Sequence, residues 1–273
     1  MPAIHPARLK QQAILVTQHF GDPPALVRSL HHLMDFYADR ASRPSQAGRP
    51  APLLPAYHVK PPVLRQVVLE LAPLAQDDPD CGLALCQAMW AQPYLEFRLM
   101  ACSLLGELPP DPPERILAQV KSWAVRDTDV TLLDALARDG LKRVRKEQSV
   151  TLVKVTEVLL SAKELDARRM GLRLLLPLVR DPGYPNLPVV FRLLLPYVRQ
   201  APGRLRPDIL DVVIALAVRS PVETASYLRQ ALTLPDSPDT AWLIRQSASA
   251  FPPEIEERLR SSVRGLGMKP AAE

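Results

Sequence analysis

The stretch LRLLLPLVR, residues 172–180, is followed by a near copy, FRLLLPYVR, at residues 191–199. Arg173 of the first copy aligns with Arg192 of the second, so the motif recurs after nineteen residues. Leucines at three- and four-residue spacing in both copies predict amphipathic helices, and nineteen residues hold one such helix with its turn. Each copy also places a proline, Pro177 or Pro196, inside its helix, where the missing backbone donor favours a kink.

The same organisation extends along most of the chain. Prolines or acidic residues typical of helix starts recur every fourteen to twenty-one residues, at Pro61, Pro79, Pro93, Pro112, Asp129, Glu147, Glu164, Pro185, Pro202 and Pro221. Two helices make a unit of roughly 38 residues, close to the ~40 of HEAT-type helical pairs. Because one pair cannot bury its apolar face alone, neighbouring pairs must stack. The sequence therefore predicts an all-α, right-handed superhelix, a solenoid of HEAT-like pairs, with its site on the concave face.

The sequence predicts four parts along the chain. Residues 1–40 predict an N-terminal helix pair, and residues 41–56, ASRPSQAGRPAPLLPA, predict a proline-rich loop. Residues 57–264 form the predicted body of HEAT-like repeats, and residues 265–273 form a C-terminal tail.

Composition excludes several classes of protein. With 47% hydrophobic and 23% charged residues among 273, the chain is typical of a globular protein and not of a disordered one. It has 30 prolines, 10 glycines and 5% aromatic residues, a balance that disfavours hairpin-rich β folds. No stretch has the ~20 apolar residues that span a bilayer, so we expect no membrane association.

Cysteine usage and the first residues favour the cytoplasm. The longest apolar run near the start, Ala13–Val16, is too short for a secretory signal. An odd number of cysteines, three in this chain, is not typical of a disulfide framework. Cys81 and Cys86 lack a second pair, which favours core packing over metal binding. The adjacent His31 and His32 face different sides of a helix, which favours surface or capping roles over catalysis.

Motifs for familiar cofactor chemistry are absent from the sequence. It contains no glycine-rich phosphate loop, no GxSxG elbow and no HExxH pattern. We therefore expect neither a cofactor nor a metal ion.

Basic residues gather in the middle of the chain, where Leu141–Lys146 reads LKRVRK. They continue at Arg168, Arg169, Arg173, Arg192, Arg199, Arg204 and Arg206. A net charge of +5 permits a polyanionic partner, and cations on a concave face would bind phosphates with salt-dependent affinity. Solvated helix faces, or cations that complement helix C-termini, are the alternative interpretation.

Asp134 and Arg169 form a second candidate constellation. They are 35 residues apart, near one two-helix unit, so they are expected on similar faces of adjacent repeats. A carboxylate and an arginine placed in this way either act together on a ligand or form a salt bridge between repeats.

Segments of the repeat region resemble a known family, the bacterial alkylpurine DNA glycosylases of the AlkD-type DNA alkylation repair family, which are built from HEAT-like repeats. Tyr57–Arg65, YHVKPPVLR, is similar to the family's early helix start. The family also has a helix boundary that carries tryptophan, acidic and basic residues. This boundary is matched by Trp90, Glu96, Arg98 and Ala101. The region of its catalytic carboxylate and phosphate-binding arginine is matched by Trp123–Asp134 and by Arg168 and Arg169. The similarity covers about residues 57–260.

The resemblance implies removal of N3- or N7-alkylated purines from double-stranded DNA. The cationic base is already a good leaving group, and the family binds the lesion from the backbone side without a deep pocket. Asp134 would stabilise the oxocarbenium-like sugar and position water, and Arg169 would hold a phosphate next to the lesion. The candidate backbone contacts are Lys142, Arg143, Arg145, Arg168 and Arg173.

The chain departs from the family where tryptophans would pack on the deoxyribose. Our matching places Val130 and Asp211 at those positions, which removes surface that holds the sugar and excludes water. Trp123 either substitutes for them or is buried between helices. The sequence leaves catalysis open, and the rival interpretation is a non-catalytic HEAT-repeat scaffold for DNA or a protein partner, with Asp134 and Arg169 simply paired.

Overall fold

A computed structural model describes residues 5–39, 54–125 and 129–266, and in these ranges the chain is helical and contains no strand. It divides into two compact units, Met1–Leu152 and Val153–Glu273, which we call the N-terminal and C-terminal units. The prediction of an all-α protein is confirmed. Among the described residues no helix is long and apolar enough to cross a membrane.

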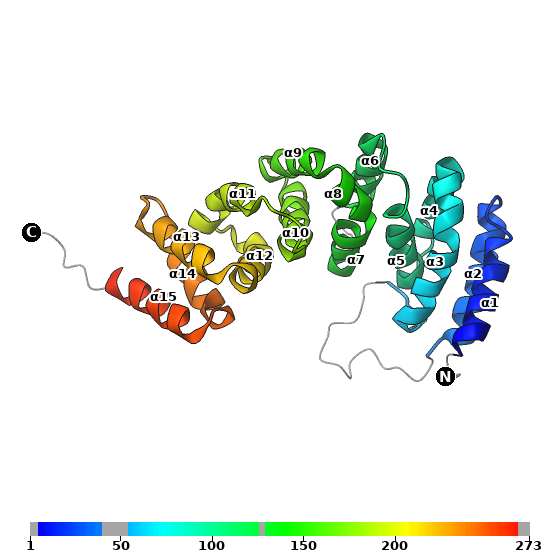
Figure 1. The fold of residues 1–273 in the computed structure, drawn as a ribbon, viewed down its shortest axis with the longest axis horizontal. Coiled ribbons are helices and arrows are strands. Elements are labelled where there is room, and N and C mark those ends of the chain that lie inside the picture. Colours follow the sequence, from blue (N-terminus) through cyan, green and yellow to red (C-terminus); the bar gives the residue numbers. More distant parts are fainter. Residues whose placement is uncertain (1–4, 40–53, 126–128, 267–273) are drawn as a thin grey trace, which may run out of the picture. The chain divides into compact units, whose positions relative to one another are not determined.

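The N-terminal unit begins with the expected helix pair (Figure 1). Its helices are α1 (Pro6–Thr17), α2 (Pro23–Tyr37), α3 (Pro61–Asp77), α4 (Pro79–Trp90), α5 (Leu95–Leu105), α6 (Pro113–Trp123), α7 (Val130–Ala135) and α8 (Lys142–Glu147). A π-helical turn, Leu136–Gly140, continues α7. Within the unit, α3 packs between α1 and α5, and α5 packs on α7 and the π-helical turn, whereas α4 packs on α2. Alternate helices therefore pack on one another.

Helix α9 (Ser149–Leu160) crosses from one unit into the other. The further helices of the C-terminal unit are α10 (Leu165–Arg180), α11 (Leu187–Arg199), α12 (Arg206–Arg219), α13 (Pro221–Thr233), α14 (Thr240–Ser247) and α15 (Pro253–Leu266). The two copies of the repeated motif are α10 and α11. Here α12 packs between α10 and α14, and α13 packs between α11 and α15. Two rows of alternating helices result.

Proline explains where many of these helices begin. Pro61, Pro79 and Pro221 occupy first helical positions, where the missing N–H costs nothing. Asp129, expected as a start, caps α7 by accepting a hydrogen bond from the backbone N–H of Thr131 at 2.7 Å. Pro177 lies inside its helix as expected. The prolines thus mark most boundaries correctly.

Ion pairs repeat at the predicted period. Lys142 pairs with Glu107, Arg192 with Glu157 and Arg173 with Asp208, and each of these pairs joins residues 35 apart. Within each unit, residues 35 apart therefore come into contact, a spacing near the roughly 38 residues expected for a helical pair.

Two predicted segments fall largely outside the described residues. Residues 41–53 of the proline-rich loop and residues 267–273 of the tail are in this group. The part of the loop that is described, from residue 54, leads into α3, and α15 extends to Leu266.

Candidate functional site

Asp134 lies in α7, a short helix of six residues in the N-terminal unit. Leu132, Leu133 and Ala135 are buried and fasten the helix to the core, and Asp134 is half-buried. A carboxylate at this depth is partly shielded from water, so its charge acts more strongly on a nearby group than at an open surface.

The π-helical turn directly after α7 is held by its own set of contacts. Arg145 Nη1 donates to the carbonyl oxygens of Ala137 and Arg138 at 3.2 and 3.1 Å. Gly106, which ends α5, lies so close that a methyl group there would meet the carbonyl oxygen of Asp139. π-helical turns are rare in proteins, and those that occur are frequently found at functional sites. Arg145 therefore fixes the backbone that follows Asp134.

Cations flank this turn on the surface of the same unit. Arg138 donates to Asp139, which raises the pKa of Arg138, and the charge of Asp134 adds to the effect. Lys142 pairs with Glu107 at 2.6 Å and remains 57% exposed. Arg143 pairs with Glu147 at 2.8 Å. Each of these ion pairs is partly exposed to water, and such pairs are worth about 0–1 kcal/mol each and can exchange partners.

A cavity of about 580 Å³ opens beside these cations. Apolar side chains of α3 and α5 form much of its lining, including Leu64, Leu69 and Met100. Arg138 and Lys142 contribute charge to the same lining. The cavity does not include Asp134.

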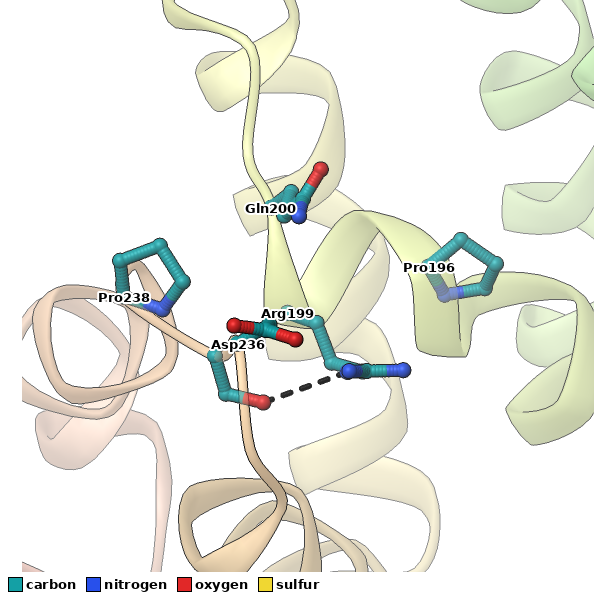
Figure 2. Close-up of a pocket in the computed structure, with 6 residues that line it drawn as sticks. Pro196, Arg199, Gln200, Asp236 and Pro238 are labelled. Atoms are coloured by element: carbon teal, nitrogen blue, oxygen red, sulfur yellow. Dashed lines mark hydrogen bonds between the residues drawn. The ribbon is translucent and has the colours of Figure 1, made fainter.

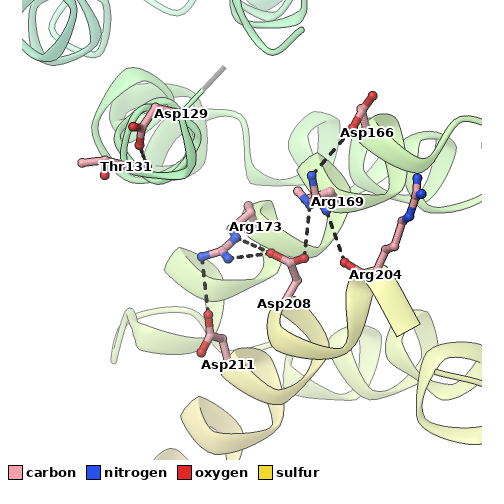
Figure 3. A network of polar contacts seen from close by, with 8 residues as sticks. All are labelled: Asp129, Thr131, Asp166, Arg169, Arg173, Arg204, Asp208 and Asp211. Carbon is pink, nitrogen blue, oxygen red and sulfur yellow. Dashed lines mark hydrogen bonds and ion pairs between the residues drawn. The ribbon is translucent and has the colours of Figure 1, made fainter. Parts of the chain in front are cut away.

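Arg169 and Arg173 meet on one carboxylate in the C-terminal unit (Figure 3). Asp208, on the first turn of α12, accepts from Arg173 Nε at 2.7 Å and from Arg169 Nε at 3.4 Å. Asp211 pairs with Arg173 at 3.4 Å. The side chains of Arg173 and Asp208 are only 9% and 4% exposed. A buried pair of this kind holds the fold together, because removing one partner leaves an uncompensated charge.

Arg168 contacts different groups from its neighbour in sequence. Its Nη2 donates to the carbonyl oxygen of Lys163 at 3.4 Å, and its buried Nε has no hydrogen-bond partner among the described residues. Arg168 lines a cavity of about 480 Å³ together with Arg192 and Tyr197. It therefore does not join the cluster around Asp208.

The two positions that lack the family's tryptophans differ in character. Val130 is 49% exposed, one turn before Asp134, whereas Asp211 is held by Arg173. Trp123 is 5% exposed and stacks on Trp90 with ring centroids 4.3 Å apart. Of the two interpretations of Trp123, burial between helices is the correct one, since a ring enclosed in this way cannot pack on a sugar.

A larger open cavity, about 720 Å³, lies in the C-terminal unit away from the predicted residues (Figure 2). It is lined by Pro196, Arg199 and Gln200 of the α11 end and by Asp236 and Pro238 of the loop before α14. The Arg199 guanidinium donates to Ser237 Oγ at 3.3 Å and to the carbonyl oxygen of Pro235 at 2.6 Å. These bonds tie one loop to one helix, so we assign Arg199 a structural role.

Two features were missed by the sequence interpretation. Asp208 was not singled out, although it follows Arg173 by the repeat spacing of 35 residues, which is the signal that identifies it. His32 is exposed as expected, whereas His31 is half-buried and takes part in a cluster of side chains. The Nδ1 of His31 lies 2.8 Å from the Tyr57 hydroxyl, and its Nε2 lies 3.3 Å from Gln92 Oε1. Burial and a hydrogen bond with Tyr94 raise the pKa of Tyr57 to about 12. The contacts of His31 with Tyr57 and Gln92 hold the segment before α3 in place.

Two of the three cysteines behave as apolar residues, whereas the half-buried Cys81 donates a hydrogen bond from its thiol to the carbonyl oxygen of Phe20. Cys86 and Cys102 are fully buried, and burial raises the pKa of both thiols. In the described part of the chain, no group of three or more histidine, cysteine, aspartate or glutamate residues is placed to hold a metal ion.

Comparison with known families identifies the family of this chain. Residues 51–206 match the model of a family described as DNA alkylation repair enzyme. The matched range contains Asp134, Arg169 and the five predicted backbone contacts, and it spans more than half of the chain.

Comparisons with individual proteins add little. No curated protein matches the sequence. Among solved structures, the chain is similar to the crystal structure of an engineered protein from a structural genomics consortium, with 13% identity and a TM-score of 0.36. The alignment covers 97% of this chain and 69% of that one.

Proposed function

Because the chain belongs to the DNA alkylation repair enzyme family, we propose that it hydrolyses the N-glycosidic bond of N3- or N7-alkylated purines in double-stranded DNA. The family match over residues 51–206 is the observation that carries this proposal. The DNA repair role follows from family membership, and the particular reaction rests on Asp134 and Arg169.

In the proposed reaction, the bond between C1′ of the sugar and the purine nitrogen breaks. The bonding electrons leave with the cationic base, which departs neutral, and the sugar passes through an oxocarbenium-like state. Asp134 stabilises that positive charge and positions a water whose oxygen bonds to C1′, while the water's proton passes to solvent. Its half-buried place on α7 supports this role, because a carboxylate partly removed from water stabilises a developing cation more strongly.

Arg169 is proposed to bind a phosphate of the DNA backbone. The further contacts that we propose are Lys142, Arg143, Arg145 and Arg168, and exposure supports Lys142 most. Arg173, which the sequence also suggested as a contact, is 9% exposed and pairs with Asp208, so we propose a structural role for it instead. Phosphate contacts position the duplex and carry no sequence information.

The proposed architecture is a right-handed solenoid of HEAT-like pairs. The packing of α12 between α10 and α14, and of α3 between α1 and α5, supports stacked pairs within each unit. A cytoplasmic location is proposed on the cysteine usage described above, and no cofactor is invoked.

The alternative is a non-catalytic scaffold that binds DNA or a protein. Val130 and Asp211 favour it, because neither provides an aromatic surface for the sugar of a lesion. A scaffold retains phosphate contacts and loses only the reaction, so the two functions differ in one observable, the release of free base.

The test is base release from methylated duplex DNA. Wild-type protein is expected to liberate free 3- or 7-methylpurine, and Asp134→Asn is expected to lose release by about 10²-fold or more while it keeps duplex binding. Asp80→Asn is the matched control, since Asp80 is an 88% exposed carboxylate of the same unit. Release by neither wild type nor control, with duplex binding retained, would establish the scaffold.

A further inference from the structure

The cluster around Asp208 has an internal order. Arg173 makes its two short contacts to one carboxylate oxygen, Oδ1, with Nε at 2.7 Å and Nη2 at 2.6 Å. Arg169 approaches the other oxygen, Oδ2, with Nε at 3.4 Å. The buried Arg173 therefore fixes the carboxylate, and the carboxylate in turn orients Arg169 (Figure 3).

Exposure separates the charged groups of this cluster. Two guanidinium groups contact the buried carboxylate of Asp208, while Asp166 and Asp211 are 39% and 46% exposed and lie at the rim. Screening by water weakens the contribution of the rim carboxylates. The side chain of Arg169 is 26% exposed and that of Arg173 is 9% exposed, so Arg169 is the more accessible of the two cations.

The donors of Arg169 are only partly used. Its Nε donates to Asp208 and its Nη2 donates to the carbonyl oxygen of Arg204 at 3.2 Å. Nη1 forms an ion pair with the 39% exposed Asp166 at 3.7 Å, which is beyond hydrogen-bond distance, and it makes no hydrogen bond to the described residues. A guanidinium has five N–H groups, so its Nη1 end keeps donors for an oxyanion.

We propose that Asp208 is the positioning residue for Arg169: anchored by Arg173, it holds the Arg169 guanidinium by Nε so that the Nη1 end stays directed at a DNA phosphate. This inference rests on the proposed function. Fixing the side chain in advance lowers the entropy that a long arginine loses on binding, which raises affinity without any contact between Asp208 and DNA.

The placement of Asp208 suits such a role. It occupies the first turn of α12, where the helix dipole stabilises a carboxylate. It is separated from Arg173 by the 35 residues of one helical pair, so two neighbouring repeats cooperate to orient one cation. A water-exposed carboxylate at the same position would be screened and would hold Arg169 less firmly.

A double-mutant cycle tests the proposal. Duplex affinity at low salt is measured for Asp208→Asn in the wild-type background and in an Arg169→Ala background, with melting temperatures recorded for every variant. Asp208→Asn is expected to weaken binding about tenfold in the wild type and to have no further effect when Arg169 is absent. The matched control is Asp211→Asn, which removes a 46% exposed carboxylate that pairs with Arg173 at 3.4 Å, and which should bind within about twofold of wild type.

A merely structural role predicts something different. Asp208→Asn lowers the melting temperature under either role, because it breaks a buried ion pair. Under a merely structural role it would weaken binding equally in both backgrounds, and that result would overturn the proposal. So would unchanged binding in the wild-type background. Should Asp208→Asn fail to fold, the cycle is run with Asp208→Glu, for which a loss of about threefold is expected that again disappears with Arg169→Ala. If the wild type binds no duplex at all, the proposed function fails first, and the positioning role fails with it.

Discussion

The predicted cations have different surroundings in the two units. In the N-terminal unit, Lys142 and Arg143 form ion pairs that water reaches, and the Lys142 side chain is 57% exposed. In the C-terminal unit, Arg173 forms an ion pair with Asp208 at the same 35-residue spacing as Lys142 with Glu107, yet its side chain is 9% exposed. One sequence spacing thus produces two kinds of ion pair.

Burial decides what each pair does. An exposed pair is screened and exchanges partners at little cost, so its cation is available for phosphates. A buried pair loses several kcal/mol when one partner is removed, so its cation is committed to the fold. The basic residues that look alike in the sequence therefore divide into exposed cations, which we propose to bind phosphates, and a buried cation with a structural role. Arg169, which is 26% exposed, is intermediate between the two groups.

The largest expected effect on the free energy of unfolding is at Arg173. Arg173→Met should lower the free energy of unfolding by about 3 kcal/mol, because it leaves Asp208 with only the more distant Arg169. The measurement is urea unfolding. Arg192→Met is the matched control, since Arg192 pairs with Glu157 at 2.7 Å over the same spacing but is 59% exposed. Equal midpoints for the two variants would contradict the distinction.

A middle-sized effect on stability is expected at Gly106, which packs against the π-helical turn after Asp134. Gly106→Ala would place a methyl group 1.8 Å from the carbonyl oxygen of Asp139, so α5 or the π-helical turn must move. We expect a loss of about 1–3 kcal/mol in thermal unfolding. The control is Gly21→Ala, because a methyl group at Gly21 would meet nothing within 4 Å. A stable Gly106→Ala protein would mean that this turn is not tightly packed.

The smallest effect is expected at Lys142. Lys142→Met removes an exposed partner of Glu107, and stability should change by less than about 1 kcal/mol. The same variant should bind duplex DNA more weakly. Unfolding and binding measured on one preparation check both statements, and a large loss of stability would place Lys142 with the structural group.

Sequence alone predicted the helical scaffold well. Pro61, Pro79 and Pro221 mark helix starts by a local rule, and the spacing between Arg173 and Arg192 gave the repeat. These features depend on residues that are close in the sequence, so they can be recognised without knowledge of the tertiary structure.

The site was harder to predict because its partners are distant in sequence. Asp208 accepts from an arginine 35 residues earlier, and His31 contacts Gln92 across 61 residues. The π-helical turn after Asp134 has no distinct pattern, since its residues also fit an ordinary helix. Burial, which separates Arg173 from Lys142, depends on packing that neither residue type reveals.

The most direct test of this division is the salt dependence of duplex affinity between about 50 and about 200 mM salt for wild type, Lys142→Met and Arg173→Met. The account predicts that affinity falls with salt in the wild type, that Lys142→Met reduces the logarithmic slope by about 0.9, the share of one phosphate, and that folded Arg173→Met keeps the wild-type slope. A flat response in the wild type would point to a protein partner, and a slope reduced by Arg173→Met but not by Lys142→Met would contradict the account.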